Sequence, residues 1–172
     1  MNLMMRLWKR AALLAILAPA LMAGCGGARL TAPSDAGPPL DESEGLMVVE
    51  TSSGRAAAEL ATQPAEIAPG DPVVLRVVNR GNLRLGYGRP ITVERWEGRE
   101  WIETEDSRDT AWTLELVLLT PNQTGVQQMW PFRDGDDSRS GWYRFTKHLQ
   151  TEDKTGEAER FAVRVRVRVV ER

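Results

Sequence analysis

The sequence contains only one cysteine, Cys25, and only one histidine, His148, among its 172 residues. A single cysteine excludes an intramolecular disulfide, and these two residues cannot supply the ligand set of a structural zinc site. A Ser-His-Asp or Cys-His catalytic site would have to use His148, which no nucleophile motif accompanies. The formal net charge of -2 gives no indication of nucleic-acid binding. We therefore predict a protein with no enzymatic activity, no cofactor and no nucleic-acid partner.

The N-terminal apolar run is short. Residues 11–23 form an uncharged stretch of about 13 residues, too few to cross a membrane as a helix. The run follows three basic residues, an order that is typical of a secretory signal peptide. It ends in Leu21-Met22-Ala23-Gly24-Cys25, which resembles the lipobox of bacterial lipoproteins, whose cysteine becomes the lipid-modified N-terminus. We predict a lipoprotein signal peptide at residues 1–24 and lipid attachment at Cys25; the alternative is an ordinary signal, with Cys25 free or discarded.

Lipid on Cys25 predicts a location at the extracytoplasmic face of the cell membrane. Each buried CH₂ of an acyl chain adds about 0.8 kcal/mol of membrane affinity. Removal of the signal takes away three cations and no anions, so the mature chain is more acidic than the full chain. Its body would therefore not be attracted to anionic headgroups. The predicted partner is the membrane, through the lipid, with an envelope protein or polysaccharide as the candidate ligand.

Residues 25–45 are predicted to form a flexible linker that begins at the lipid-bearing cysteine. The stretch 26–45 reads GGARLTAPSDAGPPLDESEG and has only two large apolar residues. It cannot bury enough apolar surface to offset the entropy lost on ordering. The linker would hold a single folded domain, residues 46–172, away from the membrane. The alternative is that part of it pairs as a first strand.

The predicted domain consists of short strands separated by turns. Apolar residues alternate along 73–77, and the segments 90–96 and 100–103 flank a turn in which Gly98 supplies a positive φ. Residues 56–61, AAAELA, have helical propensity but lie between turn signals, so their state stays open. Leu114, Leu116 and Leu118 alternate with Thr113, Glu115 and Val117, which predicts a strand with an apolar face.

Towards the C-terminus, Tyr143, Phe145 and Lys147 alternate with the residues between them, and valines at 163, 165, 167 and 169 alternate with arginines. No long amphipathic helix is indicated. Seven to nine short strands in this pattern favour an all-β fold, an antiparallel β-sandwich. A body of this size can form its core without disulfides.

Four segments form a recognisable set: a strand that ends in Asn79, the segment Tyr87-Gly88-Arg89-Pro90, a hairpin from Glu94 to Trp101, and a strand from Gly141 to Lys147. Together they resemble a family of bacterial immunoglobulin-like domains that are carried on exported proteins and lipoproteins. The resemblance covers roughly residues 48–170. These motifs build the fold rather than a reaction centre, so the resemblance implies an immunoglobulin-like sandwich and no catalytic residues.

The aromatic residues near an acidic loop are the best sequence lead to a binding site. Trp130, Phe132 and Trp142 lie close in sequence, and their rings would form a ligand patch for a sugar or peptide if they were exposed together. The loop itself, residues 134–138, carries carboxylates that could ligate calcium. It lacks the length and the spaced glutamate of an EF-hand loop. We therefore predict a solvated turn there and no metal site.

A second lead is the arginine stripe, Arg164, Arg166 and Arg168, on one face of the last strand. It could receive a polyanion, although charges on a sheet face more often remain solvated, pair with carboxylates and protect an edge against aggregation. The sequence thus predicts a lipid-anchored, non-enzymatic binding or spacer module at the cell envelope. The alternative is a protease-inhibitor-like sandwich that presents a loop, residues 104–109 or 132–140, to a protease.

Overall fold

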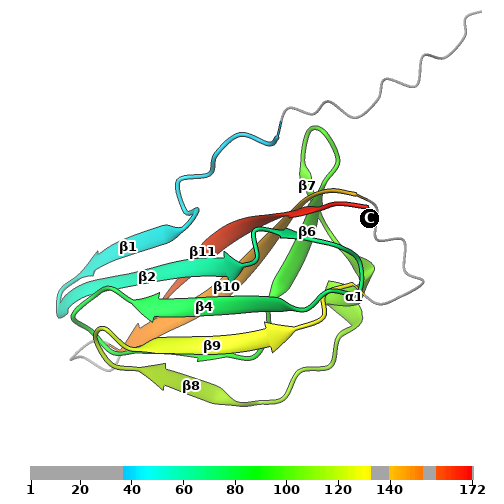
Figure 1. The fold of residues 1–172 in the computed structure, drawn as a ribbon. Helices are drawn as coiled ribbons and strands as arrows, with labels where there is room; N and C mark the ends of the chain where they lie inside the picture. Colours follow the sequence, from blue (N-terminus) through cyan, green and yellow to red (C-terminus); the bar gives the residue numbers. More distant parts are fainter. Residues whose placement is uncertain (1–36, 133–139, 153–157, 172) are drawn as a thin grey trace, which may run out of the picture. The chain divides into compact units, whose positions relative to one another are not determined.

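The protein is a two-layer β structure in a computed structural model that describes residues 37–132, 140–152 and 158–171 (Figure 1). Within these ranges it contains eleven strands and one short helix, and no helix there is long and apolar enough to span a membrane. The predicted β-sandwich is confirmed. The elements are β1 Leu46–Thr51, β2 Gly54–Gln63, β3 Glu66–Ile67, β4 Val73–Asn79, β5 Leu85–Gly88, β6 Thr92–Trp96, β7 Trp101–Glu103, α1 Glu105–Asp109, β8 Leu116–Leu119, β9 Thr124–Met129, β10 Gly141–Glu152 and β11 Ala158–Val169.

The strands divide into two sheets. One sheet has the order β1-β2-β4-β9, and all of its pairings are antiparallel. The other follows the path β3-β11-β10-β5-β8, and β6 and β7 extend it from β10. The chain passes from the edge of the second sheet to the edge of the first between β8 and β9, so these two edge strands lie on the same side of the sandwich (Figure 1).

β10 organises the larger sheet because it is long enough to pair with three strands. All twelve of its residues are in register with β11, from Gly141 opposite Val169 to Glu152 opposite Ala158. Its other edge is shared: the first part pairs with β6 and the last part with β5. The predicted hairpin of β6 and β7 is also confirmed, with Gly98 at a φ of 85° in its turn.

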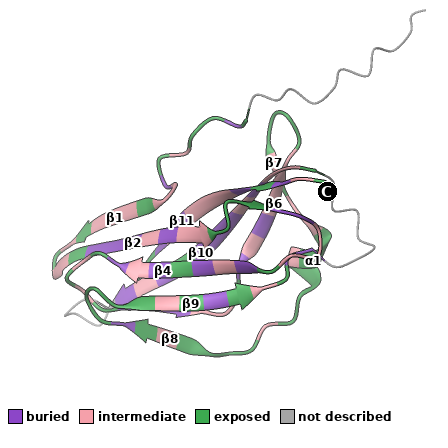
Figure 2. Ribbon diagram, viewed as in Figure 1, coloured by how far each residue is buried: buried purple, intermediate pink, exposed green. Residues whose placement is uncertain are grey.

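The core lies between the sheets and follows the predicted alternation (Figure 2). In β4, Val73, Leu75 and Val77 are buried, whereas Arg76 between them is exposed. In β11 the valines at 163, 167 and 169 are buried. Alternation decides the faces here because each strand has one side toward the other sheet.

Residues 56–61, whose state the sequence left open, lie within strand β2. Ala56, Ala57 and Ala58 are all fully buried, although successive residues of a strand point to opposite faces. The chain after β4 continues alongside β2, because the backbone N–H groups of Arg80 and Asn82 donate to the carbonyls of Ala57 at 2.8 Å and Arg55 at 2.9 Å. An alanine run therefore forms a strand here because pairing with β1 and β4 outweighs helix propensity.

The predicted strand at 112–119 is shorter than expected and faces the other way. Regular pairing covers only β8, and Leu114, Leu116 and Leu118 point to solvent while Leu119 is buried. Leu119 pairs with the buried Leu85 of β5, and this register fixes which face of β8 meets the core. The apolar face of the predicted strand is thus the outer face of the sheet.

Residues 37–45, the last part of the predicted linker, are packed against the domain. The backbone N–H of Arg164 donates to Ser43, and Gly45 donates to the carbonyl of Arg164 at 2.8 Å, which adds the segment to the edge of β11. We call residues 37–45 the N-terminal strap. Part of the predicted linker therefore pairs with a sheet, as in the alternative. Backbone hydrogen bonds and ion pairs offset the conformational entropy that the segment loses on ordering, and its composition gives no sign of these contacts.

Candidate functional site

A concave site of about 710 Å³ lies at the end of the sandwich where α1 stands beside β6 and the end of β9. We call it the end pocket. Its walls combine apolar side chains from the core margin with polar ones from the α1 segment. The lining residues are Ile91, Val93, Asp106, Ser107, Asp109, Thr110, Ala111, Trp112, Gln128, Met129, Trp130 and Pro131.

Side-chain hydrogen bonds fasten the short helix α1 to β6. Thr104 caps the helix by accepting a hydrogen bond from the N–H of Ser107, and its own N–H donates to the carbonyl of Val93 at 2.9 Å. The hydroxyl of Ser107 in turn accepts from the N–H of Val93 at 2.9 Å and donates to Glu103. The polar wall of the end pocket is therefore fixed to the sheet.

Two indole rings form part of the apolar wall. Trp130 is 59% exposed, and Trp112 is half-buried against the core. The polar wall carries the carboxylates of Asp106 and Asp109, whereas the pocket lining contains no lysine or arginine. An exposed aromatic face beside carboxylate, hydroxyl and amide groups suits a neutral polyhydroxylated or a cationic ligand rather than an anion.

The structure separates the three predicted patch residues. Phe132 is buried, and its ring packs edge-on against Tyr143 with centroids 4.5 Å apart. Trp142 is half-buried on the opposite face of β10, where the guanidinium of Arg166 lies 5.6 Å from its ring centroid. The prediction that these three rings share one patch is therefore wrong, because Phe132 lies in the core and strand alternation places Trp142 on the opposite face. Trp130 alone is exposed, and its partner in the end pocket is Trp112.

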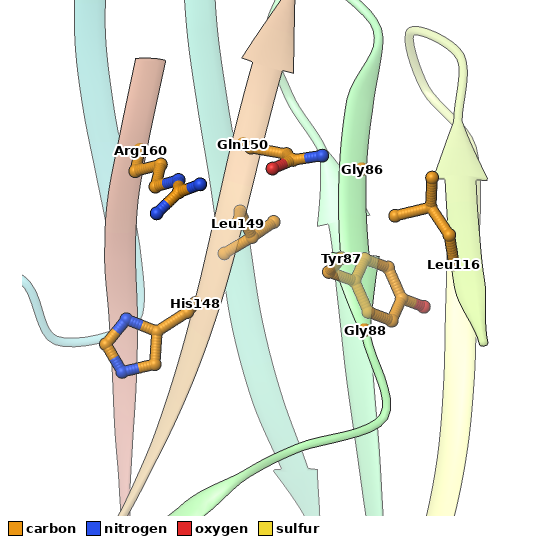
Figure 3. Close-up of a pocket in the computed structure, with 8 residues that line it drawn as sticks. All are labelled: Gly86, Tyr87, Gly88, Leu116, His148, Leu149, Gln150 and Arg160. Atoms are coloured by element: carbon orange, nitrogen blue, oxygen red, sulfur yellow. The ribbon is translucent and has the colours of Figure 1, made fainter. Parts of the chain in front are cut away.

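The sole imidazole borders a second, smaller hollow on the outer face of the larger sheet (Figure 3). This trough has a volume of about 340 Å³, and Gly86 and Gly88 of β5 form part of its floor. His148, Gln150 and Leu116 stand around it in Figure 3. The trough lining contains no serine, threonine or cysteine that an imidazole could activate as a nucleophile.

Acidic groups of the N-terminal strap meet the predicted arginine stripe. Arg166 pairs with Glu44, and the guanidinium of Arg164 lies 3.6 Å from the carboxylate of Asp41. Hydrogen bonds from the backbone and hydroxyl of Ser43, followed by the charge of Arg164, hold the pKa of Asp41 below its usual value. The polyanion interpretation is thus replaced, because the strap supplies carboxylates to Arg164 and Arg166 and Glu66 of β3 lies 3.8 Å from Arg168.

A buried lysine links the two sheets beneath the trough. Lys147 is 1% exposed, and its ammonium donates to the carbonyls of Arg89 and Pro90 at 3.2 Å and to the amide oxygen of Gln127 at 2.9 Å. The ring of Tyr87 lies 4.8 Å away. Sequence reasoning did not single out Lys147 as a special residue, although its alternation with Tyr143 and Phe145 placed it on the inward face.

Lys147 gives the domain a pH-dependent stability. Burial, followed by the nearby charge of Arg89, lowers its pKa from 10.5 to about 8. Between these values the unfolded chain binds a proton that the folded chain has released, so the free energy of unfolding rises with pH. We expect a rise on the order of 2 kcal/mol from pH 7.5 to 9.5, and almost none in Lys147→Met.

Urea titrations of both proteins at each pH measure this difference. Burial also raises the pKa of Tyr87, which lowers stability only above pH 10, so the series stops below that value. A parallel pH dependence in wild type and Lys147→Met would contradict the assignment.

The remaining predicted sites are the lipid-attachment cysteine, the acidic loop and the inhibitor loop. Cys25, the signal peptide and the acidic loop 134–138 lie outside the described residues. Across the described ranges, no group of histidine, cysteine, aspartate and glutamate could hold a metal ion. The 104–109 loop of the inhibitor alternative is largely the helix α1 and does not offer an extended strand to a protease.

Comparisons with known proteins bear on the fold. The profile of the family described as "Bacterial Ig-like domain" matches residues 55–161. Among solved structures, the ASH / PapD-like domain of human CEP192 (PapD-like domain 7) is similar at 12% identity and a TM-score of 0.34, covering 66% of this chain and 86% of that one. No curated protein sequence matches the chain.

Proposed function

Because the chain belongs to the bacterial Ig-like domain family, we propose that it is a binding module that lipid on Cys25 holds at the extracytoplasmic face of the cell membrane. The family supports a non-enzymatic binding or spacer role. The lipobox-like residues 21–25 and the apolar run before them support the anchor. The N-terminal strap begins only about a dozen residues after Cys25, so the tether between lipid and domain is shorter than the composition predicts.

The ligand we propose is a saccharide unit of an envelope polysaccharide, bound in the end pocket. The single observation that carries this proposal is that the exposed Trp130 lines the same pocket as Asp106 and Asp109. A sugar ring presents C–H groups that pack on an indole face, and its hydroxyls can donate to carboxylates. The absence of cations from the pocket lining disfavours acidic polymers.

Trp130→Ala tests this site. The probe is a soluble, neutral oligosaccharide of N-acetylglucosamine, titrated against residues 25–172 carrying Cys25→Ser, with binding followed by calorimetry. We expect saturable binding by the wild-type pocket and a loss of about tenfold or more in affinity for Trp130→Ala, since an exposed aromatic anchor carries much of such a contact.

Trp96→Ala is the matched control. Trp96 contacts Trp101 in the β6–β7 hairpin, with ring centroids 5.3 Å apart and the rings tilted by 56°, and does not line the end pocket. Its removal should leave the affinity unchanged. Equal affinities of wild type and Trp130→Ala, or no binding by wild type, would exclude the proposed saccharide site.

A further inference from the structure

The strand β8 is an unprotected edge of the larger sheet. β5 pairs with one side of it, and no strand in the described ranges pairs with the other. Edge strands expose unpaired N–H and C=O groups, and proteins usually protect them with lysine, proline or a bulge. Residues 113–119, TLELVLL, contain neither a cation nor a proline. The edge is therefore suited to pairing with another strand.

The outer face of this edge is apolar. Leu114 is fully exposed, and Leu116 and Leu118 are 56% and 52% exposed. An added Cβ at Gly86 would lie 3.3 Å from Leu118 and 3.4 Å from Leu116, so the two leucines lie over the neighbouring strand rather than over the core. Leu116 also borders the trough (Figure 3). Three leucines in alternation on a free edge form a stripe that an added strand would extend and partly cover.

We propose that a second copy of this chain covers the edge, with residues 113–119 of the two copies (β8 and the three residues before it) paired antiparallel about a two-fold axis at Leu116. In this register Leu116 faces the same residue of the second copy, and Leu114 faces the second copy's Leu118. The two leucine stripes then combine on one face of a continuous sheet. Such an interface is isologous, so one self-complementary segment suffices for both copies.

The charges of the segment favour this occupant and this direction. Glu115 is the only charged residue in 113–119, and its carboxylate is held by Arg89 of its own chain at 2.7 Å. Antiparallel pairing at Leu116 sets Glu115 opposite the second copy's Val117, so no like charges meet. Parallel pairing in register would set the two Glu115 side chains side by side, which is unfavourable.

A cysteine scan tests the interface. Cys25 is the only native cysteine, so Cys25→Ser leaves Leu116→Cys as the sole thiol of residues 25–172. Opposed residues of antiparallel strands have Cα atoms about 4.5–5.5 Å apart, within the range of a disulfide. Mild oxidation should give a covalent dimer. Leu46→Cys, which is exposed on β1 at the opposite edge of the smaller sheet, is the matched control and should form no disulfide-linked dimer.

A charge exchange tests the register. Leu116→Glu and Leu116→Lys should each weaken the dimer about tenfold or more in sedimentation equilibrium, because like charges then face each other. An equimolar mixture of the two should restore a dimer. Far-ultraviolet circular dichroism confirms that each variant is folded. A wild-type chain that stays monomeric up to about 0.5 mM, a dimer that both substitutions leave intact, or a mixture that does not reassociate would each overturn the proposal.

Discussion

Replacing Gly125 with alanine is expected to destabilise the domain by about 3 kcal/mol or more. An ideal Cβ at this position would lie 1.9 Å from the hydroxyl oxygen of Tyr87 and 3.0 Å from the ring carbon that bears it. Tyr87 is buried, and the ammonium of Lys147 lies 4.8 Å from its ring, so the ring has little room to move. Gly125 is paired with Val77 in the ladder of β9 and β4, which also restrains the backbone.

The second variant, Tyr87→Phe, isolates the cause. It removes the oxygen that the new methyl group would meet, so the loss in Gly125→Ala/Tyr87→Phe should be smaller than the sum of the two single losses by about 1–2 kcal/mol. Thr124→Ala, at the exposed neighbouring position of β9, should cost about 0.5 kcal/mol or less. Urea unfolding gives all four values, and strict additivity of the two changes would contradict the contact.

Asn79→Ala is expected to cost about 3–5 kcal/mol. Asn79 is fully buried at the end of β4, where its amide nitrogen donates to the carbonyls of Leu83 at 2.8 Å and Leu119 at 3.0 Å. Its side-chain oxygen accepts from the N–H of Gly81 at 3.0 Å. Alanine would leave all three backbone groups without this partner in a place where water does not replace it.

Asn82→Ala is the matched control for this prediction. The side chain of Asn82 also binds a backbone group, since it accepts from the N–H of Arg55 at 2.7 Å, but the residue is exposed. Water can replace its bond, so we expect a cost of about 1 kcal/mol or less. If the midpoints of urea unfolding for Asn79→Ala and Asn82→Ala moved equally, burial of the Asn79 amide would not be the source of the effect.

Much of the sandwich follows from period-two alternation. The inward faces of β4, β10 and β11 are those that the sequence predicts, because each of these strands is central enough to be covered by the other sheet. Alternation fails at β8, where Leu116 and Leu118 are apolar yet outward. An edge strand need not bury its more apolar face, and its register is decided by the strand beside it.

Contacts between distant segments could not be predicted. The strap joins Asp41 to Arg144 and Arg164, more than a hundred residues later, and composition gives no signal for such a pairing. The end pocket also depends on contacts between distant segments. Trp130 is a predicted binding residue, but nothing in the sequence pairs it with Trp112 or with the α1 residues that line the same pocket.

For Lys147, in contrast, the sequence does contain a signal of burial. A lysine in phase with Tyr143 and Phe145 is a cation on the core face, and a cation there needs hydrogen-bond acceptors. The acceptors themselves come from the turn at Arg89 and Pro90 and from β9, so the sequence indicates burial but not the partners.

The central claim, a binding module held at the membrane by a lipid-modified cysteine, is tested most directly by the intact mass of the mature protein isolated from a bacterium grown with labelled palmitate. We predict a chain that begins at Cys25, carries the label and partitions with the membrane fraction, and a Cys25→Ser chain that lacks the label. A mature chain that is unlabelled, has the mass of an unmodified polypeptide and is recovered in the soluble fraction would contradict the account.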